Sequence, residues 1–424
     1  MIVLIGIILG IEIFFLLWRS FIKEKDFFHP RTMFLFLEFI KYVPGLILLN
    51  EESSVIFTTE GALFIILFES LYILAALISM NLIKTKGITK NYAQLNIPLI
   101  IIIGSFLIGI WAKFQVINEM GGILFVLLNG QMAYQMQQHG FGVYIMLYKF
   151  MFVSILAICD LCLIKKLKKY YITAIVLIIT YMLSFLIYTS RTPGLIVMLI
   201  LLFVYNYEVK TIKFRNLTNK WIILTFFLLF SASYYAGSQR TNLTNTVEES
   251  SFYDMVRNLC NDGRDMFVYN YFSENTKWYG RGYLNIIPSL IPGVEDKPST
   301  DDGLYLVNLL RGHDVDITDN YNTLPSETGS VPFSTPAYMF ANFGGLGVIL
   351  GGFIMGLILM WTYKYMIRNI NSFNVAIYFY IIYSFGLSTG RMVPTLISIF
   401  IIYLFSFTMK KMGFAYKNNE KRRI

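Results

Sequence analysis

The chain has 424 residues, of which 56 % are hydrophobic and only 14 % are charged, and its formal net charge is +9 at pH 7. Soluble domains carry about 25 % charged residues, so this composition excludes an ordinary soluble protein. It indicates a polytopic membrane protein whose basic excess reflects topology and contact with anionic lipid, not binding to nucleic acid.

Apolar runs long enough to cross about 30 Å of hydrocarbon recur along the whole chain. The first run lacks a basic start and a small-residue cleavage site, so it is interpreted as a span and not as a signal peptide. We therefore expect an all-α fold in which residues 1–424 form one membrane domain with about eleven transmembrane helices. Their expected ranges are 2–18, 32–49, 59–83, 97–117, 143–164, 171–189, 193–207, 221–237, 335–363, 373–388 and 392–409.

Basic residues predict the orientation of these spans. With the N-terminus outside, every inner connection carries Lys or Arg, from Arg19 and Lys23 near the start to Lys410 and Lys411 near the end. Cytoplasmic connections of membrane proteins are enriched in basic residues. The distribution thus predicts an outer N-terminus, a cytoplasmic C-terminus and a large extracytoplasmic loop over residues 238–334.

The large loop carries helix signals of its own. Apolar residues recur at helical spacing over 250–272, which is typical of an amphipathic helix on the membrane surface. Further along, the residues from Ser299 to Asp302 predict an N-cap for a helix that Gly312 stops. We therefore expect the loop to be partly helical.

Arginines on the predicted outer face are the strongest candidate functional residues. Arg191 and Arg391 each lie in a short turn beside apolar helices, Arg240 opens the loop, and Arg281 lies within it. A guanidinium offers a fixed fork of donors that matches phosphate oxygens. Extension to lipid phosphates or pairing with loop acids is the alternative for any single arginine. The recurrence at outer helix ends favours a shared anionic ligand.

Other polar residues offer proton transfer and substrate contact. His313 is the one histidine of the large loop and a candidate general base, with His139 on another outer loop as its rival and a solvated role as the alternative. Where the loop returns to the membrane, Glu327, Tyr338 and Asn342 are candidates for substrate contact. The later glycines of this stretch, including Gly352 and Gly356, fit close helix packing.

Charged residues inside the predicted spans default to a functional hypothesis such as ion coupling. Glu38 and Lys41 lie three residues apart on one span, so we interpret them as a structural pair that neutralises itself. The three histidines and three cysteines show no metal-ligand spacing, and no metal or cofactor is expected.

Four features together resemble the Wzy-type polymerases that join oligosaccharide repeat units into O-antigen and capsule chains. The first is the layout of about eleven spans with one dominant outer loop before the last three. The local motifs are a turn at Tyr188–Pro193 (YTSRTP), the loop start at Gly237–Arg240 with the later Ile286–Pro298, and the loop exit at Ser334–Gly356. The layout covers the whole chain and the motifs cover about a quarter of it.

The resemblance implies a glycosyltransferase of the GT-C type in the bacterial inner membrane, working without a bound metal. Such an enzyme would transfer a growing glycan from undecaprenyl pyrophosphate onto a lipid-linked repeat unit at the outer face. It implies pyrophosphate binding by Arg191, Arg240, Arg281 and Arg391. His313 or Glu327 would then activate the acceptor hydroxyl.

Two other functions stay open at this stage. An O-antigen ligase would use the same chemistry with lipid A core as its acceptor. A transporter or flippase of lipid-linked sugars would predict paired internal repeats, which the sequence does not show. Membrane lipids and lipid-linked oligosaccharides are the expected partners, and docking of a chain-length regulator on the outer loop also stays open.

Overall fold

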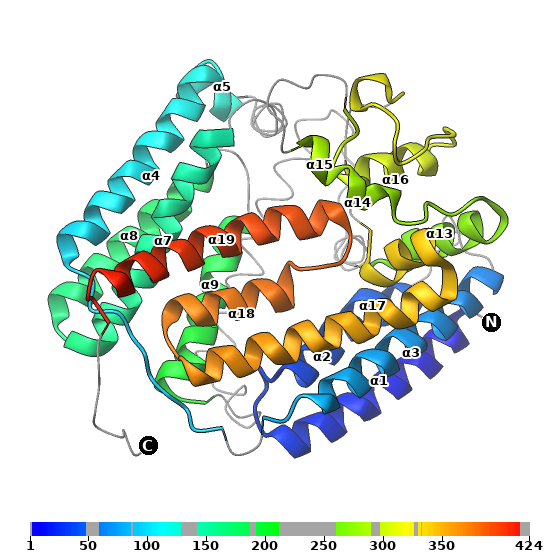
Figure 1. Ribbon diagram of the computed structural model, residues 1–424, viewed down its shortest axis with the longest axis horizontal. Coiled ribbons are helices and arrows are strands. Elements are labelled where there is room, and N and C mark those ends of the chain that lie inside the picture. Colours follow the sequence, from blue (N-terminus) through cyan, green and yellow to red (C-terminus); the bar gives the residue numbers. More distant parts are fainter. Residues whose placement is uncertain are drawn as a thin grey trace. The chain divides into compact units, whose positions relative to one another are not determined.

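The structure is a computed structural model that describes residues 2–47, 59–85, 88–128, 142–186, 192–211, 260–289, 297–325, 330–331 and 333–415. Within these ranges it is helical, and its β-type pairing consists of isolated bridges (Figure 1). Six of the described helices are long and apolar enough to cross a membrane. They are α1 (Ile2–Glu24), α3 (Thr59–Leu82), α4 (Leu99–Glu119), α7 (Gly142–Lys165), α17 (Thr335–Arg368) and α19 (Thr389–Lys411). The prediction of an all-α, membrane-embedded protein is confirmed.

Other helices fall within further predicted spans but are shorter or carry more charge. They are α2 (Pro30–Ile47), α8 (Lys168–Leu186), α9 (Thr192–Val204), which continues into the π-helical turn η2 (Tyr205–Val209), and α18 (Ser372–Tyr383). The predicted span at 221–237 lies outside the described residues. By length and composition the described helices thus support six spans, not eleven.

The fold consists of two compact units, each assembled from separate parts of the chain. The first comprises Met1–Lys86, Ser251–Tyr363 and Tyr380–Ile397, and the second comprises Gly87–Ser250, Lys364–Phe379 and Ser398–Ile424. The prediction of a single membrane domain over residues 1–424 stays a prediction.

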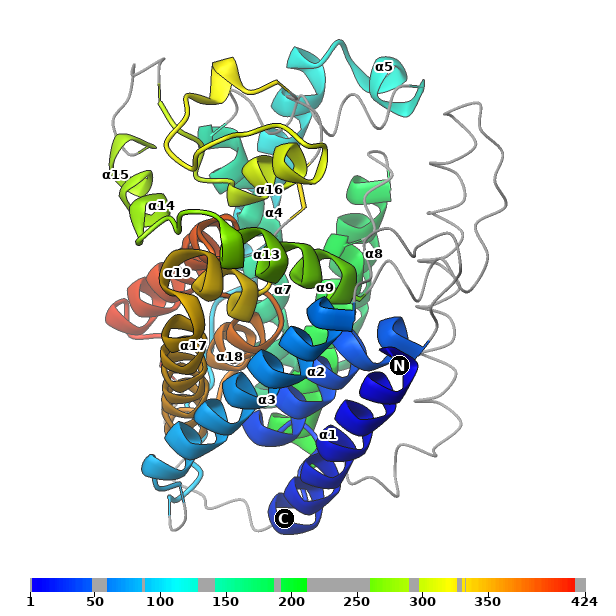
Figure 2. The ribbon, with the colours of Figure 1, turned by 90° about the vertical axis from the view of Figure 1, so that its right-hand side faces the viewer.

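In the first unit, short helices of the large loop gather at one end of α3 and α17 (Figure 2). They are α13 (Asp262–Glu274), α14 (Arg281–Leu284), α15 (Ile286–Ser289), α16 (Asp302–Leu310) and the 3-10 turn η3 (Tyr321–Thr323). The described part of the loop is therefore partly helical, as expected. Residues 250–259, the start of the predicted surface helix, lie outside the described residues.

Helix α16 begins and ends at the predicted signals. Asp301 is its N-cap, and its Oδ1 accepts the backbone N–H of Gly303 at 3.1 Å. Gly312 follows the helix with φ +81°, a left-handed conformation that glycine adopts without strain. The cap residues thus explain why this loop segment is a short, well-defined helix.

Aromatic packing fixes α13 on the membrane helices of the first unit. The ring of Phe68 on α3 lies 5.1 Å from Tyr269 on α13 and 4.7 Å from Phe340 on α17, and the latter two rings are 5.0 Å apart. Such aromatic clusters contribute beyond the area that they bury. The loop is therefore anchored on α3 and α17 by an apolar contact.

Helix α17 is broken near its N-terminal end. Its 34 residues would extend about 51 Å, well beyond the hydrocarbon core, but Gly344 has φ +66° and ψ −156°. The break leaves residues 335–343 beside the loop and a straight span over 345–368. Within that span Gly352 and Gly356 lie against the backbone of Tyr72 and Ala76 on α3, so the prediction of close packing by these glycines is confirmed.

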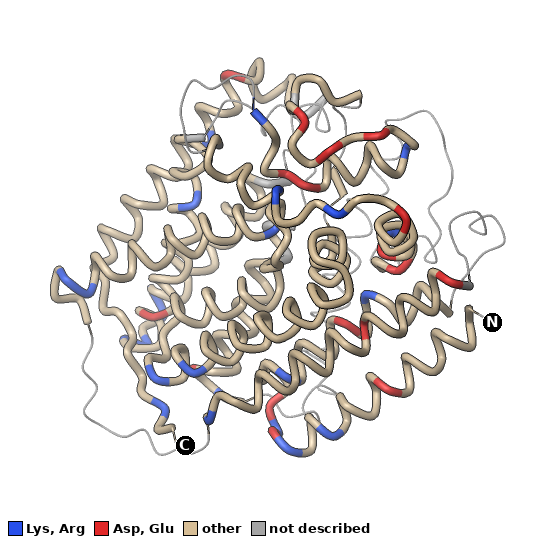
Figure 3. The backbone as a smooth tube through the Cα atoms, turned by 45° about the vertical axis from the view of Figure 1, so that its right-hand side comes forward, with Lys and Arg blue, Asp and Glu red and all other residues tan. Residues whose placement is uncertain are grey.

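Charged residues lie where α1 is joined to α2 in the first unit. Lys23, Lys25 and Arg31 occur there together with Glu24 and Asp26, whereas acidic residues are frequent along the described loop (Figure 3). The loop contacts α2 farther along, where the N–H of Asn261 donates to the carbonyl of Lys41 at 2.8 Å. The connection to α1 and the contact with the loop thus lie at different positions along α2, and the orientation of the chain in the membrane stays a prediction.

The second unit is built on the packing of α4 against α7, with α8 beside α7. Ser105 and Ser154 are hydrogen-bonded at 3.0 Å across the α4–α7 contact. Deeper in this unit Asp160 is buried and accepts the backbone N–H groups of Leu95 and Ser372, each at 2.8 Å. One carboxylate therefore ties together three distant parts of the chain.

Candidate functional site

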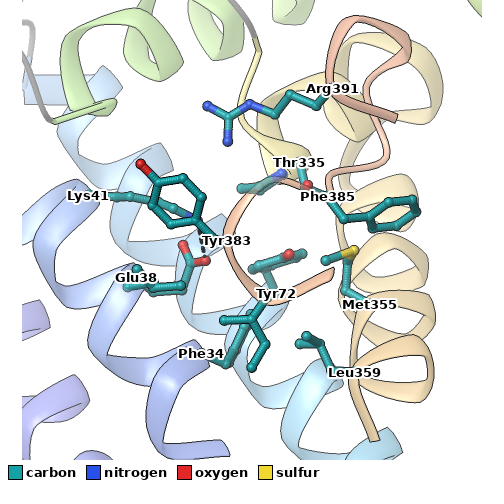
Figure 4. A pocket seen from close by; sticks show the side chains of 13 residues that line it. Phe34, Glu38, Lys41, Tyr72, Thr335, Met355, Leu359, Tyr383, Phe385 and Arg391 are labelled. Carbon is teal, nitrogen blue, oxygen red and sulfur yellow. Dashed lines mark hydrogen bonds and ion pairs between the residues drawn. The ribbon is translucent and has the colours of Figure 1, made fainter. Parts of the chain in front are cut away.

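A pocket in the first unit is lined by α2, α3, α17 and the segment that joins α18 to α19 (Figure 4). Its polar lining consists of Glu38, Lys41, Tyr72, Thr335, Tyr383 and Arg391. Phe34, Leu37, Pro336, Met355, Leu359, Ile382 and Phe385 complete it. The pocket thus combines charged groups with an apolar wall inside a bundle of membrane helices.

The charged groups of the pocket come from α2 and from the start of α19. Lys41 Nζ lies 2.6 Å from Oε1 of Glu38, whose side chain is only 3 % exposed. Arg391 reaches the pocket from the start of α19, on the side away from Met355 and Leu359 (Figure 4). The lining thus holds two cations and one carboxylate, with the buried carboxyl of Glu69 beside Glu38, and the guanidinium is the group best suited to bind an anionic ligand.

The large loop holds the turn that carries Arg391. The hydroxyl of Tyr283 on α14 donates to the carbonyl of Leu387 at 2.8 Å. From the start of α17, Thr335 Oγ1 accepts the N–H of the same leucine at 3.3 Å. A loop helix and a membrane helix thus fix the turn immediately before Arg391.

Asp302 on α16 lies against the first residues of α19. It is fully buried, and its Oδ2 is 3.5 Å from Oγ1 of Thr389. Burial raises the pKa of Asp302 to about 7 and the neighbouring Asp301 adds to the increase, whereas Gly390 N–H and the Arg391 guanidinium oppose it. The charge beside the Arg391 turn therefore changes close to neutral pH.

The structure places the predicted arginines differently from one another. Arg391 lines the pocket. Arg281 instead pairs with Asp316 at 2.8 Å, with both side chains more than a third exposed, which corresponds to the alternative of pairing with a loop acid. Arg191 and Arg240 lie outside the described residues. The predicted cluster is thus represented in the pocket by Arg391.

Of the predicted general bases, the structure describes only His313, and this residue is not in the lining of the pocket. His313 is exposed just after the end of α16, where its backbone N–H donates to the carbonyl of Asn308 at 3.0 Å. Glu327 and His139 lie outside the described residues. The role of a general base in this pocket by any of these three residues stays a prediction.

Tyr338 and Asn342 are completely buried near the start of α17. Asn342 accepts the N–H of Gly280 at 2.9 Å and donates to the carbonyl of Tyr338 at 2.8 Å. The ring of Tyr338 packs edge-on against Tyr283 and Phe333. These contacts favour a role in holding the loop, and substrate contact by either residue stays a prediction.

Sequence analysis paired Glu38 with Lys41 correctly but did not connect the pair with Arg391. The three side chains line one pocket although they come from opposite ends of the chain. Tyr72, Thr335 and Tyr383 were not singled out. The signal that points to the pocket is the charge pair itself, because ionisable residues within membrane spans are rare and usually functional.

Comparisons with protein-family models, with curated proteins and with solved structures find no match for this chain. Among the described residues, no group of three or more His, Cys, Asp or Glu side chains is arranged to hold a metal ion. The function proposed below therefore rests on the pocket and on the resemblance of the motifs.

Proposed function

We propose that this protein is a Wzy-type polymerase, a glycosyltransferase that acts on polyprenyl-pyrophosphate-linked oligosaccharides. It transfers a growing glycan from undecaprenyl pyrophosphate onto a lipid-linked repeat unit at the outer face of the bacterial inner membrane. The proposal includes a GT-C-like architecture of eleven spans, an outer N-terminus and a cytoplasmic C-terminus. The observation that carries it is the meeting of Arg391 and Lys41 in one pocket among membrane helices.

The chemistry of the pocket suits a pyrophosphate leaving group. Negative charge develops on the departing diphosphate, and cations already in place stabilise that charge without reorganising. Arg391 can bind two phosphate oxygens through its fork, whereas Lys41 acts as a point charge. Arg391 lines the pocket directly, whereas Lys41 is paired with Glu38 at 2.6 Å before any ligand binds.

The remaining lining of the pocket is consistent with the two ends of such a substrate. Met355, Leu359 and Phe34 offer an apolar surface for a polyprenyl chain. The loop helices that hold the Arg391 turn offer polar groups for the sugars. Arg191 and Arg240 stay in the proposal as further phosphate ligands, and Arg281 as a loop residue paired with Asp316.

Reconstitution of the purified protein in liposomes with a single lipid-linked repeat unit tests the proposal. A ladder of glycan lengths on the carrier supports a polymerase. A product that forms only when lipid A core is added identifies a ligase instead. Movement of the lipid-linked sugar across the bilayer without a new glycosidic bond identifies a transporter or flippase.

A further inference from the structure

We propose that Glu38 is the general base of the transfer and that its protonation releases Lys41 to the departing pyrophosphate. The inference rests on the proposed function and adds the base that the exposed His313 does not supply. It starts from the pocket, in which Glu38 is the single carboxylate among the described lining residues. A general base must lie within hydrogen-bond reach of the proton that it removes.

The two oxygens of Glu38 have different surroundings. Oε1 is 2.6 Å from Lys41 Nζ, whereas Oε2 is buried and faces no amine, amide or hydroxyl donor among the described residues, with the buried carboxyl of Glu69 on α3 as the neighbour of Glu38. A buried oxygen without a partner is costly, so it marks a place where a donor binds. The hydroxyl of an acceptor sugar is such a donor. Asp265, Asp302 and Glu69 are also buried carboxyl groups, but none of the three lines this pocket.

Charge balance connects the two members of the pair. Before the reaction, Glu38 and Lys41 neutralise each other at a separation that allows direct contact. The acceptor oxygen forms a bond to the anomeric carbon of the donor glycan and its proton passes to Glu38. The bond from that carbon to the pyrophosphate oxygen breaks, and the electron pair leaves with the pyrophosphate.

Protonated Glu38 no longer neutralises Lys41, and the pyrophosphate has gained one negative charge. The free ammonium can therefore compensate the charge of the leaving group, beside Arg391. The local charge stays unchanged throughout, which matters in a site with little water, because an uncompensated buried charge is expensive. The Glu38–Lys41 contact is thus a reactive pair and not only a structural one.

The test compares Glu38→Gln with Glu12→Gln in the reconstituted polymerase. Glu12 is another carboxylate within a membrane helix, and its Oε2 accepts from Ser70 at 2.9 Å, outside the pocket. Glu38→Gln should slow chain extension by about 100-fold or more, the usual contribution of a general base. Glu12→Gln should retain the wild-type rate. Undecaprenyl pyrophosphate should raise the melting temperature of the wild type and of Glu12→Gln equally, and that of Glu38→Gln at least as much, because glutamine, like protonated Glu38, does not neutralise Lys41.

Three results overturn the assignment. A Glu38→Gln variant that extends chains within about threefold of the wild-type rate would show that this base is not required. Loss of carrier binding together with activity makes Glu38 a binding residue. The double variant Glu38→Gln, Lys41→Met gives the third result. If it slows chain extension by the product of the factors measured for the two single variants, the two residues act independently. If the wild-type protein makes no ladder, the polymerase proposal itself is rejected. That outcome differs from a failure of the Glu38 assignment, in which the wild type still makes a ladder.

Glu38→Asp keeps the assignment testable if the glutamine variant does not fold. The shorter side chain keeps the carboxylate but withdraws it from the acceptor by about one methylene. Extension should fall by about tenfold or more, with carrier binding unchanged. A fully active aspartate variant contradicts a base whose position is fixed by this pocket.

Discussion

The hydroxyl of Tyr42 on α2 donates a 2.6 Å hydrogen bond to Oδ2 of Asp265 on α13. Both side chains are buried, so the bond ties the large loop to α2. Burial raises the pKa of Asp265 to about 6, and hydrogen bonds from Ser334 and Tyr42 oppose that increase. The contact is thus one of the polar anchors of the loop.

Replacement of Tyr42 by Phe should destabilise the protein by about 1–3 kcal/mol, because it leaves a buried carboxyl group with one donor fewer. Thermal unfolding in detergent, followed by circular dichroism, measures the loss. Tyr271→Phe is the control, since Tyr271 makes only an exposed 3.4 Å contact with Asp314. Equal melting temperatures for the two variants would contradict the anchoring role.

Arg391→Ala should reduce chain extension by about 100-fold or more, the usual cost of losing one donor to developing negative charge. Arg391→Lys should also lose most activity, because an ammonium cannot bind two phosphate oxygens at once. The ladder assay measures both variants. Arg311→Ala is the control, because Arg311 is exposed at the end of α16 and is not in the lining. A fully active lysine variant would point to contact with lipid headgroups.

His313→Ala should leave both the rate and its pH profile unchanged, because this histidine is exposed and is not in the lining of the pocket. Ladder assays across pH 5–8, the range in which histidine ordinarily titrates, check this. A pH–rate profile that becomes flat in His313→Ala would assign the role of general base to His313 instead of Glu38.

Asp302 should make stability depend on pH below neutrality. Its pKa in the folded protein, about 7, is above the ordinary 3.8, so the folded protein retains a proton that the unfolded chain releases. Stability from this group is therefore complete below about pH 4 and is lost as the pH rises toward 7. Asp302→Asn should flatten this part of the melting-temperature profile and exceed the wild type at pH 8.

Asp316 supplies a control of opposite sign for that measurement. Burial alone would raise its pKa, but hydrogen bonds from Thr318 and the charge of Arg281 outweigh burial and lower it. The contribution of Asp316 to the stability of the folded protein is therefore present at neutral pH and is lost on acidification. A profile for Asp302→Asn that is parallel to the wild type between pH 4 and 7 would contradict the prediction.

Gly344→Ala should destabilise the protein by about 1–3 kcal/mol, because φ +66° with ψ −156° is a backbone region that only glycine tolerates well. The added Cβ would also lie 3.0 Å from Cε of Lys277. Gly104→Ala is the control, since that glycine lies inside α4 with open space around it. A stabilised Gly344→Ala variant, measured by thermal unfolding, would mean that α17 can continue without the break.

Local features of the fold could be predicted from the sequence. The long apolar helices follow from hydropathy alone, and α16 follows from Asp301 and Gly312 because capping is decided by neighbouring residues. The Glu38–Lys41 pair was likewise predictable from its helical spacing. Each of these signals lies within a few residues of the structure that it predicts.

Long-range relationships could not be predicted. Nothing in the spacing of Glu38 and Arg391 indicates that α2 and the start of α19 line one pocket. Asn342 looked available for substrate, but its amide is used by Gly280, a contact that depends on how the loop folds back. Gly344 could not be told from the neighbouring glycines, because only tertiary packing decides which of them breaks the helix.

The bonding of Asp160 has a consequence for biosynthesis. Its second backbone partner, Ser372, is synthesised 212 residues later, so this carboxylate enters the membrane long before its hydrogen bonds are complete. The second unit can therefore close only after the ribosome has delivered the start of α18, which makes its assembly a late, post-insertion event.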